Sequence, residues 1–87
     1  MESYESNRKN KRFVSIINGK KYHFGLKNGS TYIDHKDKIK RENYIKRHQV
    51  REDWTNVNSG SLSRYLLWGH STSLEANIKD YIKRFNL

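Results

Sequence analysis

An Asn18-Gly19 dipeptide lies between two apolar-rich runs, residues 12–17 and 20–26, and constrains the fold more than any other feature of the sequence. Asn and Gly both accept the positive φ that the central residues of a type I′ turn require. Such a pair flanked by apolar runs is the strongest short-range signal of a β-hairpin. We therefore expect two antiparallel strands that meet at this turn.

The turn also sets the register and the faces of the hairpin. Counting outward from it pairs Ile17 with Lys20, Ser15 with Tyr22 and Phe13 with Phe24. Alternation along the strands then places the larger apolar side chains on one face, which we expect to be the core side: Phe13, Ile17, Tyr22, Phe24 and Leu26. The other face carries Val14, Ile16, Lys21 and His23. Because two strands alone are marginally stable in water, helices are expected to cover the core face.

The N-terminal segment, residues 1–10, is polar and charged and shows no apolar periodicity. We interpret it as a disordered arm with a basic end, and loose phosphate contacts are expected from Arg8, Lys9, Lys11 and Arg12. The folded domain is then residues 11–87.

After the hairpin, residues 31–33 suit either a short third strand or an extended lead-in to a helix. A helix is expected from about Lys36 to Arg51, with Asp34 as its N-cap. Trp54, just beyond that helix, is expected to fill the core.

Two further helices are expected in the C-terminal part of the chain. Ser61 is placed to cap a short apolar helix over residues 61–69 that ends at Gly69, and Thr72 with Glu75 forms a capping-box pattern ahead of an amphipathic helix ending near Phe85. The predicted fold is therefore a small single α+β domain, an antiparallel hairpin followed by three helices.

Charge points to a polyanionic partner. The formal net charge is +9, and fourteen of the eighteen Lys and Arg residues lie between Arg8 and Arg51. Such an excess favours nucleic acid through counterion release from phosphates, or an anionic membrane surface. The absence of Cys excludes disulfides and Cys-based zinc sites, and no apolar run approaches the roughly 18 residues of a membrane span.

A single face of the predicted 36–51 helix carries much of this charge. Spacings of four, four, three and four place five side chains in one row: Lys36, Lys40, Tyr44, Arg47 and Arg51. We expect this row to follow a DNA backbone, with Tyr44 either stacking on a base or packing inside the protein. The plainer interpretation of such a row is a solvated helix face. Lys20 and Lys21 at the hairpin tip and Lys27 in the next turn are expected to reach a neighbouring strand or groove.

The residues that could support catalysis are few. His35, His48, Asp34 and Asp37 resemble a metal site only loosely, because no His pair at i, i+4 and no third ligand accompany them. We expect no enzyme activity, catalytic residue, metal or other cofactor. We expect His48 to be partly buried and hydrogen-bonded, and His35 to begin a helix or to contact a phosphate. Arg64 lies in an otherwise apolar helix and suits either an internal pair with Glu52 or Asp53 or a phosphate contact.

Taken together, the order of short motifs resembles a family of small, basic, uncharacterised proteins of nucleocytoplasmic large DNA viruses, of the phycodnavirus and mimivirus type. The resemblance runs from about residue 11 to residue 85 and rests on these motifs: Phe24-Gly25, His35-Lys36-Asp37, Tyr44-Ile45, Arg47-His48, residues 51–54, residues 63–68, Ser73-Leu74 and residues 83–85. The chain departs from the family pattern at Asp53, where Asn is common, and at residues 69–71, where Asn-Lys-Pro is common. The resemblance implies a virus-encoded virion protein and suggests genome packaging, but supplies no activity.

These arguments predict a non-sequence-specific double-stranded DNA-binding protein that condenses or packages a viral genome like a chromatin protein. The alternative is a minor capsid or internal virion protein that binds other virion proteins or the anionic inner membrane. The corresponding location is the virion and the viral factory in the host cytoplasm. A homodimer is compatible with either function.

Overall fold

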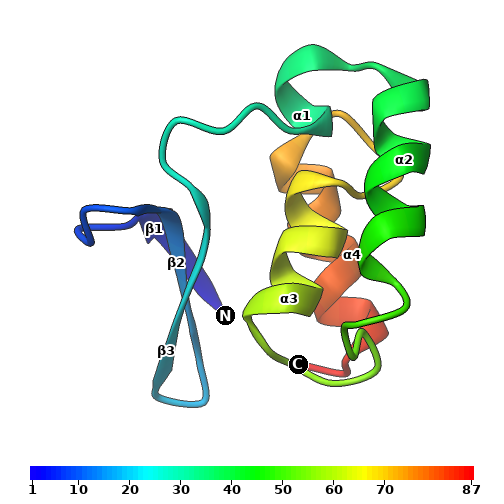
Figure 1. Cartoon of the computed structure of the whole chain (residues 1–87). Helices are drawn as coiled ribbons and strands as arrows, with labels where there is room; N and C mark the ends of the chain where they lie inside the picture. Colours follow the sequence, from blue (N-terminus) through cyan, green and yellow to red (C-terminus); the bar gives the residue numbers. More distant parts are fainter.

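The computed structural model describes all residues, 1–87, and shows a three-stranded antiparallel sheet beside a group of helices (Figure 1). The strands are β1 (Glu2–Glu5), β2 (Lys11–Ile17) and β3 (Lys20–Leu26), in the order β1-β2-β3. Asn18 and Gly19 have φ values of 52° and 79°, as a type I′ turn requires. The predicted register is confirmed, with Ile17 opposite Lys20 and Phe13 opposite Phe24. The predicted α+β class is also confirmed.

The N-terminal arm is not disordered, so that prediction is wrong. Residues 2–5 pair with β2 in an antiparallel register that places Glu2 opposite Ile16 and Glu5 opposite Phe13. Two side-chain hydrogen bonds tie the segment down: Ser3 Oγ lies 2.8 Å from Ser15 Oγ, and Ser6 Oγ lies 2.7 Å from Nδ1 of His23. Polar side chains thus hold this strand, which is why apolar periodicity did not reveal it.

The chain enters its helices earlier than predicted. Residues 32–35 form a short helix, α1 (Tyr32–His35), rather than a third strand or an extended lead-in. Asp34 is not an N-cap: its carboxylate accepts the backbone N–H of Thr31 at 2.8 Å, closing a capping box. Lys36 then adopts a left-handed conformation with φ 60°, which ends α1.

The main basic helix, α2 (Lys38–His48), therefore starts two residues later than expected. Asp37 is its N-cap, and the Asp37 carboxylate accepts the backbone N–H groups of Ile39 at 2.9 Å and Lys40 at 3.3 Å. Lys36 and Arg51 both lie outside this helix.

Two caps in the C-terminal part are also displaced from their predicted positions. Asn58, not Ser61, caps α3 (Ser59–Leu62), which continues directly into a π-helix, η1 (Ser63–Leu67). Ser73, not Thr72, caps α4 (Leu74–Arg84). None of the helices combines the length and apolar character that crossing a membrane requires.

The core lies between the sheet and the helices. Its fully packed members come from the hairpin, α3, η1 and α4: Ile17, Phe24, Leu62, Leu66, Leu67 and Tyr81. Leu26, predicted to be in the core, is exposed, because Gly25 has φ +77° and interrupts the alternation of β3. Trp54 also lies outside the core cluster, against the guanidinium of Arg64, so the prediction that it fills the core is wrong.

Candidate nucleic-acid interface

The hairpin tip presents two of the predicted lysines to solvent. Lys20 and Lys21 follow the Asn18-Gly19 turn directly and are exposed, and Nζ of Lys20 lies 5.2 Å from the centroid of the Tyr22 ring. Lys27, immediately after β3, is exposed as well. All three are free to meet a phosphate group.

Further cations surround His23 on the same sheet. The pKa of the His23 imidazole is lowered, first by partial desolvation and then by the positive charges of Arg8, Lys21 and Lys11. The sheet side of the molecule therefore carries a basic region, which we call the sheet region and define by its cations: Arg8, Lys11, Lys20, Lys21 and Lys27.

A second basic region follows α2. Lys40 and Arg47 are exposed on the helix, Lys36 is exposed in the turn before it, and Arg51 is exposed in the turn after it. We call these four residues the helix region. They remain accessible although they do not all share one helix.

Tyr44 is the exception among the predicted site residues. Only 7% of its surface is exposed, and its ring is stacked between the ring of Trp68, at 4.3 Å between centroids and 3° between planes, and that of His48, at 4.2 Å. Tyr44 is therefore a packing residue and presents no platform for a base. Because Lys40 and Arg47 lie within roughly 60° of Tyr44 around the helix, they flank the buried side instead of forming an outward row.

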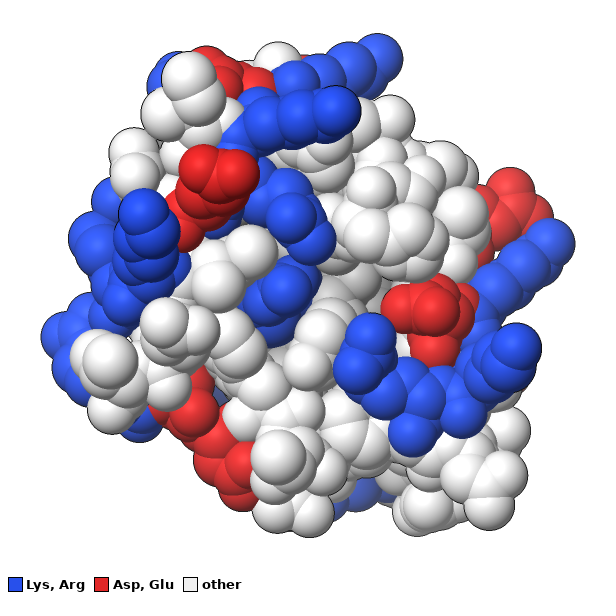
Figure 2. Space-filling model, turned by 90° about the vertical axis from the view of Figure 1, so that its right-hand side faces the viewer, with Lys and Arg blue, Asp and Glu red and all other residues white.

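The two basic regions lie on different sides of the molecule. Figure 1 places the hairpin and α2 at opposite ends of the view, with the remaining helices between them. The face that includes α2, shown in Figure 2, carries Lys and Arg side chains along its rim and near its middle, with acidic side chains beside several of them. The structure thus separates the predicted cations into two groups and does not unite them.

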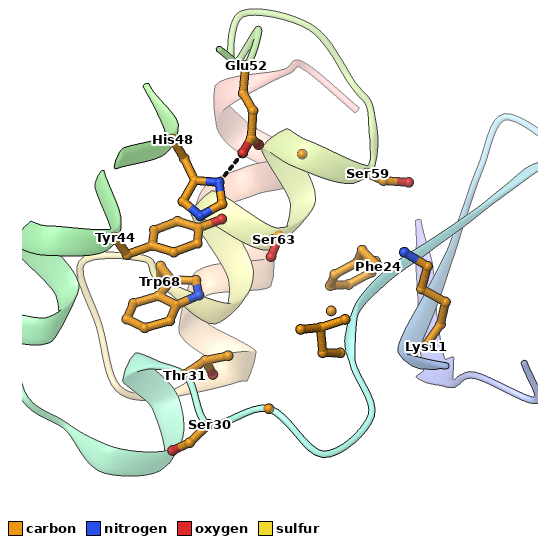
Figure 3. Close-up of a pocket in the computed structure, with 14 residues that line it drawn as sticks. Lys11, Phe24, Ser30, Thr31, Tyr44, His48, Glu52, Ser59, Ser63 and Trp68 are labelled. Atoms are coloured by element: carbon orange, nitrogen blue, oxygen red, sulfur yellow. Dashed lines mark hydrogen bonds and ion pairs between the residues drawn. The ribbon is translucent and has the colours of Figure 1, made fainter. Parts of the chain in front are cut away.

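A cavity of about 390 Å³ lies between the sheet and the helices (Figure 3). Lys11 and Phe24 line it from the sheet, and the stacked rings of His48, Tyr44 and Trp68 line it from the helical side. The cavity is a hollow in the interface between the two layers, with mixed polar and apolar walls.

The His48 side chain is held at the edge of this cavity. Its Nδ1 is hydrogen-bonded to the Glu52 carboxylate, whose other oxygen accepts the indole N–H of Trp54 at 3.2 Å. The prediction of a half-buried, hydrogen-bonded His48 is confirmed. No group of three or more His, Cys, Asp or Glu side chains is arranged to hold a metal ion.

His35 does not begin a helix, and it faces inward. It is the last residue of α1, its Nδ1 accepts the backbone N–H of Asp37 at 3.0 Å, and its Nε2 is buried without a partner. Both predictions for His35, a helix start and a phosphate contact, are therefore wrong.

Arg64 has no acidic partner. Glu52 is engaged with His48 and Trp54, while Asp53 accepts hydrogen bonds from Thr55 and Asn56. The Arg64 guanidinium instead donates to the backbone carbonyl of Trp68 at 2.8 Å. The predicted internal ion pair does not exist.

Sequence reasoning also missed Arg41, whose Nε donates to the carbonyl oxygens of Trp68, at 3.2 Å, and Gly69, at 2.8 Å. Nothing in the spacing of Arg41 distinguishes it from the neighbouring basic residues of α2. Its role depends on the turn after η1, which lies 27 residues further along the chain.

Comparison with known proteins gives one family. No curated protein and no solved structure matches the chain significantly. One family model matches residues 2–48, more than half of the chain, and covers the sheet, α1 and α2. The chain therefore belongs to DUF5754, a family of unknown function.

Proposed function

We propose that this protein binds double-stranded DNA without sequence preference and condenses or packages a viral genome. The proposal rests on one observation: few of the protein's Lys and Arg side chains form ion pairs with its own carboxylates. Of the eighteen Lys and Arg side chains, only Arg12 and Arg84 form ion pairs with a carboxylate. Most of the remaining cations are exposed and available to an external polyanion, and the release of counterions from its phosphates favours binding.

Three of the nine carboxylates are absent from these pairs because they perform structural tasks. Asp37 caps α2, Asp53 accepts hydrogen bonds in the following turn, and Glu52 holds His48. Asp34 is the acid that forms a close ion pair, at 2.6 Å from Arg12. These four acidic groups thus support the fold and leave most of the surface cations unpaired.

The placement of the cations supports compaction. The sheet region and the helix region lie on different sides of one domain, so a single molecule offers phosphate contacts to two duplexes. Condensing a genome requires more than one DNA-binding surface per particle, and this arrangement supplies two without a dimer. The resemblance to proteins of large DNA viruses is the basis for proposing the virion and the viral factory as its locations.

One observation favours the alternative, a structural virion protein that binds other proteins. Ile39 on α2 and Val50 in the turn after it are 70% and 78% exposed. Exposed apolar side chains on a basic helix suit a protein partner as well as solvent.

The test is a gel-shift titration of two unrelated duplexes at about 50 mM and about 200 mM salt. The wild type is compared with a Lys40/Arg47/Arg51→Ala variant and with a Lys79/Lys83→Ala variant, which removes exposed cations outside both regions. We expect the wild type to bind the two duplexes with equal affinity and more weakly at the higher salt concentration. We also expect Lys40/Arg47/Arg51→Ala to lose more DNA affinity per charge removed than Lys79/Lys83→Ala does. Absence of a shift at low salt would refute DNA binding and favour the protein-binding alternative.

A further inference from the structure

Two arginines meet at the turn that follows η1, and a third shares the ring of Tyr65 with one of them, although all three come from different elements. Arg41 lies in α2, Arg64 in η1 and Arg84 at the end of α4. Arg41 Nε and Arg64 Nη1 both donate to one acceptor, the Trp68 carbonyl oxygen, at 3.2 Å and 2.8 Å, so their guanidinium groups are direct neighbours. We call Arg41, Arg64 and Arg84 the arginine cluster.

Aromatic rings fix the orientation of all three groups. The Arg64 guanidinium carbon lies 5.3 Å from the ring centroid of Trp54 and 5.0 Å from that of Tyr65. Arg84 lies 4.1 Å from the same Tyr65 ring, and Arg41 lies 5.5 Å from the ring of Tyr32. Cation–π contacts on all three guanidinium groups, and a shared carbonyl acceptor for Arg41 and Arg64, therefore help to hold them in place before any ligand arrives.

Their charge is poorly compensated. Neither Arg41 nor Arg64 forms an ion pair, and the one acidic neighbour, Asp80, lies 3.8 Å from Arg84 and 3.8 Å from His70. The Nε of Arg64 is buried and has no hydrogen-bond partner. Burial, followed by repulsion from Arg41 and Arg84, lowers the pKa of Arg64. Arg41 and Arg64, neighbouring cations without an ion-pair partner, destabilise one another, and a bound anion would relieve that repulsion.

The local backbone is built to hold this arrangement. The π-helix ends with the N–H of Trp68 donating to the carbonyl of Ser63, and such widened turns recur at functional sites. Gly69 has no room for a side chain, since a Cβ there would lie 2.3 Å from the carbonyl oxygen of Tyr65. Asn77 Nδ2 fixes both ends of the turn by donating to the carbonyls of Leu66 at 3.0 Å and Ser71 at 2.8 Å.

We propose that the arginine cluster is a binding site for a phosphate group. Guanidinium groups present several N–H donors in a planar fork that matches phosphate oxygens, and a low-dielectric aromatic surrounding strengthens such contacts. The phosphate belongs either to a nucleic-acid backbone or to a small phosphorylated molecule. The proposal of a phosphate site is based on the geometry of the arginines. Only the assignment of the phosphate to a nucleic-acid backbone rests on the proposed function.

The alternative role for these arginines is purely structural, as donors that satisfy the last carbonyls of η1. The two roles differ in their response to anions. A phosphate site saturates and stabilises the folded protein in the presence of phosphate beyond the effect of chloride at equal ionic strength. A structural role gives no such difference.

The experiment titrates the full chain with inorganic phosphate and, separately, with pyrophosphate, and follows Trp fluorescence and the melting temperature against chloride at matched ionic strength. Trp54 and Trp68 are the only tryptophans and both contact Arg64, so the signal reports on the cluster. Variants are Arg64→Gln, Arg84→Gln, which removes no backbone hydrogen bond, and Lys79→Gln as the charge-matched control.

We expect saturable binding in the wild type and in Lys79→Gln, and at least a tenfold weaker response in Arg64→Gln and in Arg84→Gln. Equal responses to phosphate and chloride would contradict the proposed phosphate site. So would a loss of phosphate binding in Lys79→Gln as large as that in Arg84→Gln.

A final titration with duplex DNA separates the two sources of the phosphate. If Arg84→Gln weakens DNA binding several-fold more than Lys79→Gln does, the ligand is a backbone phosphate. If it loses phosphate binding but keeps DNA affinity, the ligand is a small phosphorylated molecule. Failure of the wild type to bind DNA, with phosphate binding retained, would refute the proposed function and leave the site standing.

Discussion

At the scale of single residues, the ion pair of Arg12 and Asp34 stabilises the fold in a pH-dependent way. Two guanidinium nitrogens contact the two Asp34 oxygens at 2.6 Å and 2.7 Å, and this hydrogen-bonded charge lowers the pKa of Asp34 far below its ordinary value. A carboxyl group with a depressed folded-state pKa stabilises the protein above its unfolded pKa of about 3.9, and that stabilisation is lost as the pH falls.

The Asp34→Asn variant should therefore be less stable than wild type by about 1–2 kcal/mol near neutral pH, a modest value because both side chains are partly exposed. The difference should shrink below about pH 4. Urea unfolding across this pH range measures it, with Glu42→Gln, an exposed acid without a partner, as the control. A pH-independent difference would show that lost packing, not charge, is responsible.

Alanine substitutions at two glycines distinguish the cost of backbone strain from the cost of a packing clash. Gly19 and Gly25 have nearly the same φ, +79° and +77°, but a Cβ on Gly19 meets nothing within 4 Å, whereas one on Gly25 would lie 2.8 Å from Cδ1 of Leu67. Gly19→Ala should cost about 1 kcal/mol through strain alone, and Gly25→Ala about 1–3 kcal/mol more because the fully buried side chain of Leu67 must shift. Equal losses in thermal unfolding would contradict the close contact between Gly25 and η1.

At the scale of elements, β1 gives a sharp prediction. Because residues 2–5 form a strand paired with β2, their paired amides should be protected in hydrogen exchange, and deletion of residues 1–5 should lower the free energy of unfolding by about 1–3 kcal/mol. If residues 1–5 were a disordered arm, their amide hydrogens would exchange at once and their deletion would leave the free energy of unfolding unchanged. NMR-detected exchange distinguishes the two.

The elements also show what the sequence could and could not predict. The hairpin was predictable down to its register, since Asn18-Gly19 specifies the turn and alternation specifies the faces. The strand β1 was not, because its contacts are made by Ser3 and Ser6 to residues of the hairpin. Helix starts were misplaced by one to three residues where Thr31, Asn58 and Ser73 compete with nearby polar residues for the capping position.

The candidate site was predictable as a set of cations but not as a geometry. Helical spacing placed Tyr44 in the middle of a basic row, yet spacing cannot tell which side of a helix faces the core. Trp68, from a distant element, stacks on Tyr44 and so decides that orientation. The arginine cluster was hidden for the same reason, because Arg41 and Arg64 meet only at the turn after η1 and Arg84 reaches them only through the ring of Tyr65.

At the scale of the whole molecule, two basic regions on different sides predict bridging. A bead-tethered duplex incubated with the protein should capture a second, labelled duplex at low salt, and addition of about 200 mM salt should release it. The Lys20/Lys21/Lys27→Ala variant should bind one duplex but lose most of this capture, whereas Lys79/Lys83→Ala should retain it. Capture that survives equally in both variants would mean that bridging comes from self-association and not from opposite faces.

The central claim is that exposed cations of the sheet and helix regions bind DNA phosphates, and its most direct test is the salt dependence of the binding constant. Each phosphate contact adds about 0.9 to the slope of log K against log salt concentration. We predict a steep wild-type slope that is the same for unrelated duplexes and falls by about 1–3 in the Lys40/Arg47/Arg51→Ala and Lys20/Lys21/Lys27→Ala variants. A slope that both variants leave unchanged, or no binding at the lowest salt, would contradict the claim.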